Sequence, residues 1–191
     1  MSPADGRVYL ALANSSGDAS CASQALPGSG PTAECGRTAD PYGRVIRWRE
    51  DSPDGSAHTF RWETFLTAGA PDLTPAGLFA SPKGLWFAAD GTLWISTGIS
   101  GHRLNGPDSV HRAAGNNALL TADTTTGTVR RFLTAPRGAE ITGVSATPDA
   151  QTLFVNIQHP GEHPTTSTWP DLAAGSPPRS ATVTVQRASR T

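Results

Sequence analysis

The feature that most constrains the fold of this chain is a short motif that occurs three times. In each copy a turn containing aspartate precedes a group of bulky apolar residues, at residues 5–10, 90–95 and 149–155. Aspartate and glycine favour tight turns, whereas aromatic and β-branched residues favour strands. Because the copies lie far apart, they indicate a repeated strand unit with long intervening loops.

The second and third copies are each preceded by another strand-like run, at residues 84–87 and 141–144. Each copy therefore forms a hairpin of strand, aspartate-containing turn and strand. After the second copy, residues 117–123 and 128–133 flank a Thr-Thr-Gly turn and make a further hairpin. Four consecutive antiparallel strands of this kind are one blade of a β-propeller.

The flanking segments supply the remaining strands. Residues 7–13, 44–48 and 59–66 fit the last three strands of a preceding blade, and 181–185 adds one strand to the last hairpin. The sequence thus predicts an all-β fold, a partial β-propeller of about ten strands arranged as three, four and three. This amounts to about 2.5 blades and not a closed ring. A β-sandwich is the alternative, but tandem hairpins with aromatic second strands at a long spacing favour blades.

Three long loops are expected, at residues 15–40, 98–115 and 160–178. Loops of this length in a compact domain are usually functional or disordered. No amphipathic helix is expected, apart from a turn or two near residues 72–79. Cys21 and Cys35 lie in the first loop, where a disulfide would close about 15 residues and add roughly 3 kcal/mol. Two free thiols are equally compatible with the sequence.

Composition excludes two classes of function. The formal net charge is −1 and 16% of the residues are charged, so no basic field exists to attract nucleic acid. No apolar run approaches the roughly 20 residues of a membrane span. The first residues also lack the basic, apolar and small-residue succession of a signal peptide.

Several stretches resemble a known family, in consistent order over nearly the whole chain. The most specific begins with Glu-Ile-Thr-Gly at 140–143 and ends with Asn-Ile-Gln-His-Pro-Gly-Glu at 156–162. These stretches resemble the PhoX family of bacterial alkaline phosphatases. Further stretches that are similar to the family lie at residues 40–50, 84–95, 116–119, 127–133 and 178–183.

The resemblance implies a function. PhoX proteins are exported propellers that hydrolyse phosphate esters with calcium and iron held at the centre of the ring, and hard cations of this kind need clustered oxygen ligands. The whole chain, residues 1–191, resembles only the C-terminal part of the family's propeller. The upstream part normally brings the export signal, the cysteine ligand of iron and several acidic ligands. Neither Cys21 nor Cys35 matches that cysteine.

Two hypotheses follow. The chain is either part of a metal-dependent phosphatase with a phosphate ester substrate, or a catalytically inactive propeller fragment or binding scaffold. The resemblance implies a periplasmic or extracellular location, and the chain alone is expected to be inactive. Uncovered blade faces predict association with the missing N-terminal half or self-association.

Three residues are the main candidates for chemistry. Glu140 precedes an inner strand, and the resemblance makes it a predicted metal ligand, although a lone glutamate there would usually be solvated. Arg137 lies just before it and would stabilise charge on a transferring phosphoryl group; an ordinary exposed arginine fits equally well. Asn14 ends the first strand, where it would bind substrate phosphate or cap a turn.

Other residues have supporting roles or weaken the metal site. Thr142, Gln158, His159 and Glu162 are predicted to orient ligands or to fix the loop of the site. Where the family has aspartate, this chain has Lys83, and where the family has Thr-Asp-Gly, it has Thr97-Gly98-Ile99. Both differences remove a carboxylate and weaken the case for an intact metal cluster.

Two further groups are interpreted as structural. His102 and His111 share a loop with Asp108, but their spacing satisfies no rule for zinc. Four tryptophans are expected to pack in the core and between blades: Trp48, Trp62, Trp86 and Trp94. The arginines of the outer hairpin, residues 123–131, are expected to face water.

Overall fold

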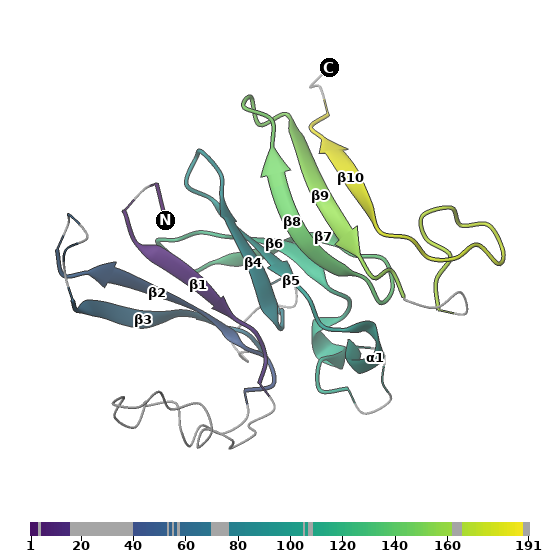
Figure 1. The fold of residues 1–191 in the computed structure, drawn as a ribbon, viewed down its shortest axis with the longest axis horizontal. Helices are drawn as coiled ribbons and strands as arrows, with labels where there is room; N and C mark the ends of the chain where they lie inside the picture. Colours follow the sequence, from purple (N-terminus) through teal and green to yellow (C-terminus); the bar gives the residue numbers. More distant parts are fainter. Residues whose placement is uncertain are drawn as a thin grey trace.

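The computed structural model describes residues 1–3, 5–15, 40–52, 54, 56, 58–69, 77–104, 106, 109–161 and 166–188. Within these residues the fold is all-β, with three antiparallel sheets that lie side by side and do not close into a ring (Figure 1). The predicted partial propeller, with strands arranged as three, four and three, is confirmed.

We call the three sheets blades 1, 2 and 3. Blade 1 contains β1 (Val8–Leu12), β2 (Arg44–Glu50) and β3 (Phe60–Thr67). Blade 2 contains β4 (Pro82–Phe87), β5 (Leu93–Thr97), β6 (Ala118–Ala122) and β7 (Val129–Thr134). Blade 3 contains β8 (Glu140–Ala146), β9 (Thr152–Gln158) and β10 (Ala181–Gln186). In each blade the strands are neighbours in the order of the sequence.

The repeated aspartates close the turns that the sequence predicts. A carboxylate oxygen accepts a hydrogen bond from the backbone N–H two residues later at Asp5, Asp90 and Asp149. Such side-chain bonds stabilise a turn because the aspartate replaces a backbone partner. The motif therefore sets where each hairpin turns, which in turn sets the register of the apolar residues in the next strand.

The blades pack face to face. β5, the second strand of blade 2, contacts β8, the first strand of blade 3. β1 contacts β4 in the same manner, which gives β1 the place of a second strand, as the sequence predicts. One buried cluster joins blades 1 and 2 through Tyr9, Val45, Leu93 and Ile95, among others. A second cluster joins blades 2 and 3, with Leu119, Ala135, Ala139, Ile141, Val155 and Ile157.

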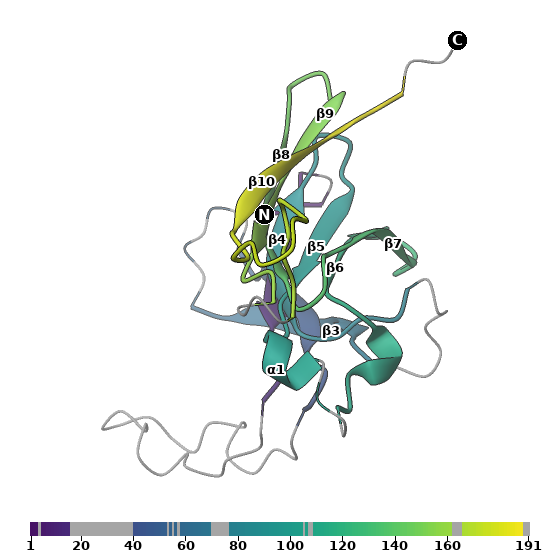
Figure 2. The same cartoon turned by 90° about the vertical axis from the view of Figure 1, so that its right-hand side faces the viewer.

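The four longest connections lie at one end of the sheets, which we call the loop end. They are residues 13–43, 68–81, 98–117 and 159–180, and the short connection 135–139 lies at the same end. Residues 51–59, 88–92, 123–128 and 147–151 connect strands at the other end. The third connection contains α1 (Gly101–Leu104) and the 3₁₀ helix η2 (Arg112–Ala114), which the sequence did not predict. Figure 2 shows α1 beyond the ends of the strands. Such short helices leave no periodic pattern in a sequence.

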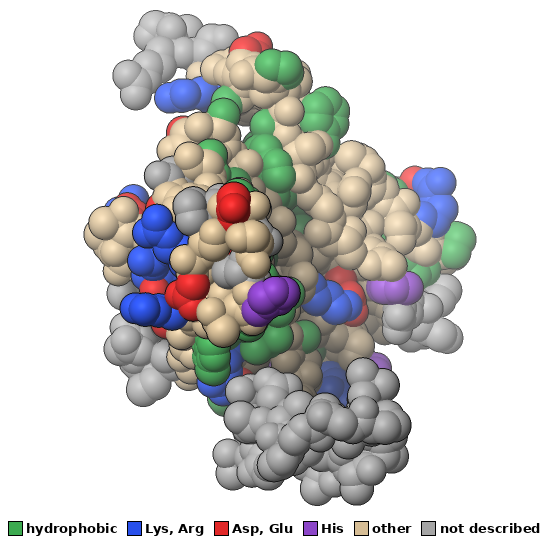
Figure 3. Space-filling model, turned by 60° about the vertical axis from the view of Figure 1, so that its left-hand side comes forward, with side chains coloured by type: hydrophobic (Ala, Val, Ile, Leu, Met, Phe, Trp, Pro, Cys, Tyr) green, Lys and Arg blue, Asp and Glu red, His purple; other side chains and the backbone are tan. Residues whose placement is uncertain are grey.

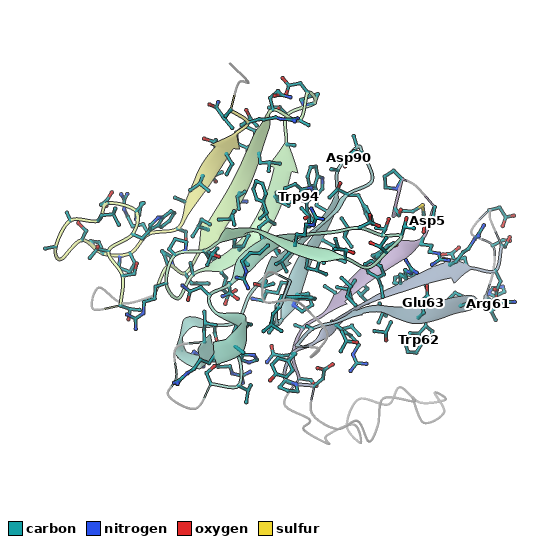
Figure 4. All side chains as sticks on the ribbon, turned by 180° about the vertical axis from the view of Figure 1, so that it is seen from behind. Asp5, Arg61, Trp62, Glu63, Asp90 and Trp94 are labelled. Atoms are coloured by element: carbon teal, nitrogen blue, oxygen red, sulfur yellow. The ribbon has the colours of Figure 1, made fainter. Side chains whose placement is uncertain are left out.

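Two structural expectations were wrong. Trp62 is not buried: 52% of its surface is exposed, because it lies on the face of blade 1 that points away from blade 2 (Figure 4). Trp86 and Trp94 do pack together, with ring centroids 6.3 Å apart. Arg131 is half-buried and turns to backbone partners, whereas its neighbour Arg130 is exposed. The Arg131 guanidinium donates hydrogen bonds to the carbonyl oxygens of Leu78, Ala114 and Asn116.

No helix in the described part of the chain is long and apolar enough to cross a bilayer. Cys21 and Cys35, expected either as a disulfide or as two free thiols, lie outside the described residues. So do residues 72–76 of the turn expected near residues 72–79.

Candidate functional site

An ion pair at the loop end joins blades 2 and 3. Glu140 is the first residue of β8, where it pairs with Gln158 of β9, and only 6% of its surface is exposed. Lys83 is the second residue of β4, and its Nζ lies 2.6 Å from Oε2 of Glu140. The Lys83 side chain is 45% exposed, so its ammonium group also borders solvent. The predicted metal ligand therefore contacts a lysine.

The backbone at Gly98, just after β5, leaves space for this ion pair. A Cβ atom at this position would overlap Cδ of Lys83 and would lie 2.9 Å from its Cε. The same atom would lie 3.1 Å from Oε2 of Glu140. The three positions at which the sequence was expected to form or lose metal ligands thus converge on one point.

Close backbone packing holds β4 and β5 against β8. Ser96 Oγ donates to the carbonyl oxygen of Thr142 over 3.1 Å and accepts a hydrogen bond from the Gly84 N–H, also over 3.1 Å. A side chain at Gly84 would lie 2.9 Å from the same Thr142 oxygen. Thr142 therefore supports the site through its backbone, which fixes the height of β8 and of Glu140 relative to β4.

Asn14 joins this region from blade 1. It lies half-buried after the end of β1, and its Oδ1 accepts a hydrogen bond of 2.8 Å from Ser81 Oγ. Ser81 is buried, has a φ of 53°, and its carbonyl oxygen accepts from the Gly98 N–H over 3.1 Å. A continuous path of contacts thus runs from Asn14 through Ser81 to Gly98 and the ion pair.

Asn117, which directly precedes β6, organises the loop end, and the sequence did not predict it as a site residue. Its side chain is buried, and its Nδ2 donates 2.8 Å bonds to the carbonyl oxygens of Ile99 and Ala139. Its Oδ1 accepts from the Ile99 N–H over 2.8 Å. Asn117 thereby fixes the residue that precedes Glu140. The signal in the sequence is the Asn-Asn pair at residues 116–117, which belongs to a stretch that is similar to the family.

The structure places three of the four remaining candidates. Arg137 is exposed in the turn between β7 and β8, and His159 is exposed after β9 with a φ of 50°. Gln158 is half-buried beside Glu140. Glu162 lies outside the described residues.

The two loop histidines are far from equivalent. His102 is exposed on α1, whereas His111 is buried with its ring 5.9 Å from that of Tyr42. Burial lowers the pKa of His111, and the positive charge of Arg103 lowers it further. The Nδ1 atom of His111 accepts or donates no hydrogen bond among the described residues. Asp108 lies outside the described residues.

The donor set at Glu140 does not fit calcium or iron. Those hard cations need several carboxylate or carbonyl oxygens around one point. Here a single carboxylate faces an ammonium group, and nowhere in the described part of the chain do three His, Cys, Asp or Glu side chains gather. Two hollows, of about 660 and 450 Å³, lie at the end of the blades opposite the loop end. Asp90 lines both hollows, and Trp94 lines the smaller one.

Comparisons with known proteins agree with the fold. None of the curated proteins compared with the chain matches it. The PhoX structure from Pseudomonas fluorescens, in complex with the transition-state analogue vanadate, is 39% identical with a TM-score of 0.77. It is matched over 98% of this chain and 32% of its own length, so this chain spans about a third of it.

A gluconolactonase from Xanthomonas campestris, XC5397, is 22% identical over 62% of this chain and 38% of its own, with a TM-score of 0.35. That likeness carries no weight. The model of the family "Alkaline phosphatase PhoX" matches residues 1–161. The chain, with its partial propeller and its inner-strand Glu140, belongs to the PhoX family of alkaline phosphatases.

Proposed function

We propose that this chain forms part of the substrate-binding rim of a phosphate monoester hydrolase. The observation that carries the proposal is the group formed by Lys83, Glu140 and Asn14 at the loop end of a chain that PhoX matches. The vanadate complex of P. fluorescens PhoX supports it, because vanadate there is described as a transition-state analogue. An alkaline phosphatase acts on phosphate esters, so a phosphate monoester is the proposed ligand.

The side chains suit a phosphate group. Lys83 uses one donor for Glu140, and its partly exposed ammonium has donors left for phosphate oxygens. Asn14 accepts from Ser81 with its Oδ1, which leaves its amide N–H groups to donate to the same ligand. Glu140 holds Lys83 in position, and the exposed Arg137 supplies a second positive charge nearby in the sequence. Such preorganised donors stabilise the charge that develops on a transferring phosphoryl group.

The proposal includes calcium and iron as cofactors of the whole hydrolase. Since Glu140 faces Lys83, ligands for these ions would have to come from outside the described residues. A bound hard cation would neutralise phosphate charge and polarise the ester oxygen. The proposal also includes a periplasmic or extracellular location, which rests on the family alone.

A binding experiment tests the proposal more directly than turnover. We expect titration with orthovanadate to show binding, and Lys83→Met and Asn14→Ala each to weaken it about tenfold. Arg61→Met, which removes an exposed cation from β3, is the control and should leave binding unchanged. Absence of vanadate binding to the folded chain would contradict the proposal. Release of p-nitrophenol from p-nitrophenyl phosphate by this chain alone is expected to be undetectable.

A second function, a catalytically inactive scaffold, is favoured by one observation. The contact between Lys83 and Glu140 occupies the carboxylate that a metal-dependent site would use. If vanadate does not bind and the chain is well folded, this interpretation replaces the first.

A further inference from the structure

The charge on Glu140 requires a cation. The carboxylate is almost fully removed from water, and an isolated buried charge is strongly unfavourable. In many proteins a bound metal or a paired side chain supplies the compensating charge. Here the ammonium of Lys83, the only lysine of the chain, lies 2.6 Å from Oε2.

The route of the lysine side chain depends on a glycine. Gly98 does not have a positive φ, so its backbone conformation is one that other residues adopt. What excludes a side chain is space, because a Cβ atom there would overlap Lys83 and closely approach Glu140. The absence of a side chain at position 98 is therefore what allows Lys83 to reach Glu140. Lys83 of β4 and Gly98, just after β5, together provide the positive charge beside Glu140 of β8.

We propose that Lys83 is a tethered cation that takes the place of a divalent metal ion at Glu140. Positions 83, 98 and 140 converge at one point, so carboxylates at all three would form a group of oxygen ligands there. With lysine at 83 and glycine at 98, the positive charge is instead covalently attached to β4. This site then needs no divalent cation and holds blades 2 and 3 together without one. The inference concerns a cation at Glu140 and does not rest on phosphatase activity.

Calcium binding measured on the intact chain tests this. For the wild-type chain we expect no shift of the thermal unfolding midpoint with millimolar calcium and no sensitised terbium luminescence. For the double variant Lys83→Asp/Gly98→Asp we expect calcium to raise the midpoint, since a ligand that binds the native state stabilises it. Terbium luminescence should appear in this variant, and adding Glu140→Gln to it should abolish both signals.

Two results would overturn the proposal. One is stoichiometric calcium binding by the wild-type chain that Glu140→Gln removes. The other is failure of a folded double variant, judged by its circular dichroism, to bind calcium or terbium.

A single substitution tests the proposal even if the double variant does not fold. Gly98→Ala should lower the unfolding midpoint of the wild-type background by several degrees, because it displaces Lys83 from Glu140. Gly106→Ala is the control, because a Cβ at Gly106 would make a close contact of 3.3 Å with the His102 carbonyl oxygen but would not overlap it, and it would not touch the ion pair. Equal effects of the two substitutions would show that Gly98 does not serve the ion pair and would overturn the proposal.

Discussion

At the scale of single residues, Arg131 has a role that its neighbour lacks. Its guanidinium donates to three backbone carbonyl groups of the loop end, and burial lowers its pKa. Removing these donors leaves carbonyl oxygens without partners, so Arg131→Met should lower the free energy of unfolding by about 2 kcal/mol. Arg130→Met, on the same strand but exposed, should change it little. Urea unfolding of the two variants checks this, and equal losses would contradict it.

His111 should make stability depend on pH. Burial and the charge of Arg103 lower its pKa below the ordinary value of 6.5, so the unfolded chain binds a proton more readily than the folded chain. The contribution of His111 to the free energy of unfolding should therefore be fully present above pH 6.5. It should decrease as the pH falls below that value.

Urea unfolding at pH 7.5 and 5.5 measures this effect. His111→Phe should reduce the loss of stability between the two pH values, whereas His102→Gln, at an exposed histidine, should leave that loss unchanged. A loss that is the same in the wild-type chain and His111→Phe would contradict the assignment.

The sequence predicted where Glu140 would lie but not what would bind it. Its position at the start of a strand follows from a local pattern of hydrophobic residues. The contact with Lys83 joins residues 57 positions apart, and it depends on how two blades pack and on the missing side chain at Gly98. The burial of Arg131 was missed for the same reason, because its acceptors belong to loops and not to its own hairpin.

At the scale of elements, the hairpins were predictable because their causes are local. Each repeated aspartate closes its own turn, and the alternation of side chains in the following strand sets which residues are buried. The short helices α1 and η2 have no such signal. They are held by tertiary contacts: Ile99, Leu104 and Ala114 form a small core with the partly buried Tyr42.

The buried side chain of Asn117 holds several connections of the loop end together. Its amide joins the end of β5, the connection after it and the residue before β8. Asn117→Ala would leave several buried backbone groups without partners, so we expect a loss of about 3 kcal/mol in the free energy of unfolding. Asn116→Ala, at the adjacent half-buried residue, should cost much less.

Hydrogen exchange would locate the effect of Asn117→Ala. Faster exchange should appear at Ile99 and in α1 before it appears in blade 1, because the lost bonds hold the loop end of blade 2. Uniformly faster exchange across all three blades would contradict a local role for Asn117.

At the scale of the whole molecule, blade 1 has one covered and one uncovered face. Tyr9 and Val45 face blade 2, and their strand neighbours Leu10 and Ile46 point the other way. That outer face also carries Trp48, Phe60 and Trp62. Figure 3 brings this side of the molecule forward and shows hydrophobic side chains beside charged ones. In a propeller such a face would contact another blade, and the described strands provide none for it.

The uncovered face should make the chain associate with itself. Phe60 and Trp62 are 57% and 52% exposed, and clustered exposed aromatic residues favour contact with a second apolar surface. We expect sedimentation velocity to show larger species as the concentration of the wild-type chain rises. Phe60→Ser/Trp62→Ser should shift the distribution towards monomer, whereas Leu172→Ser, at an exposed leucine of the connection between β9 and β10, should not. A wild-type chain that stays monomeric at every concentration would contradict self-association through the outer face of blade 1.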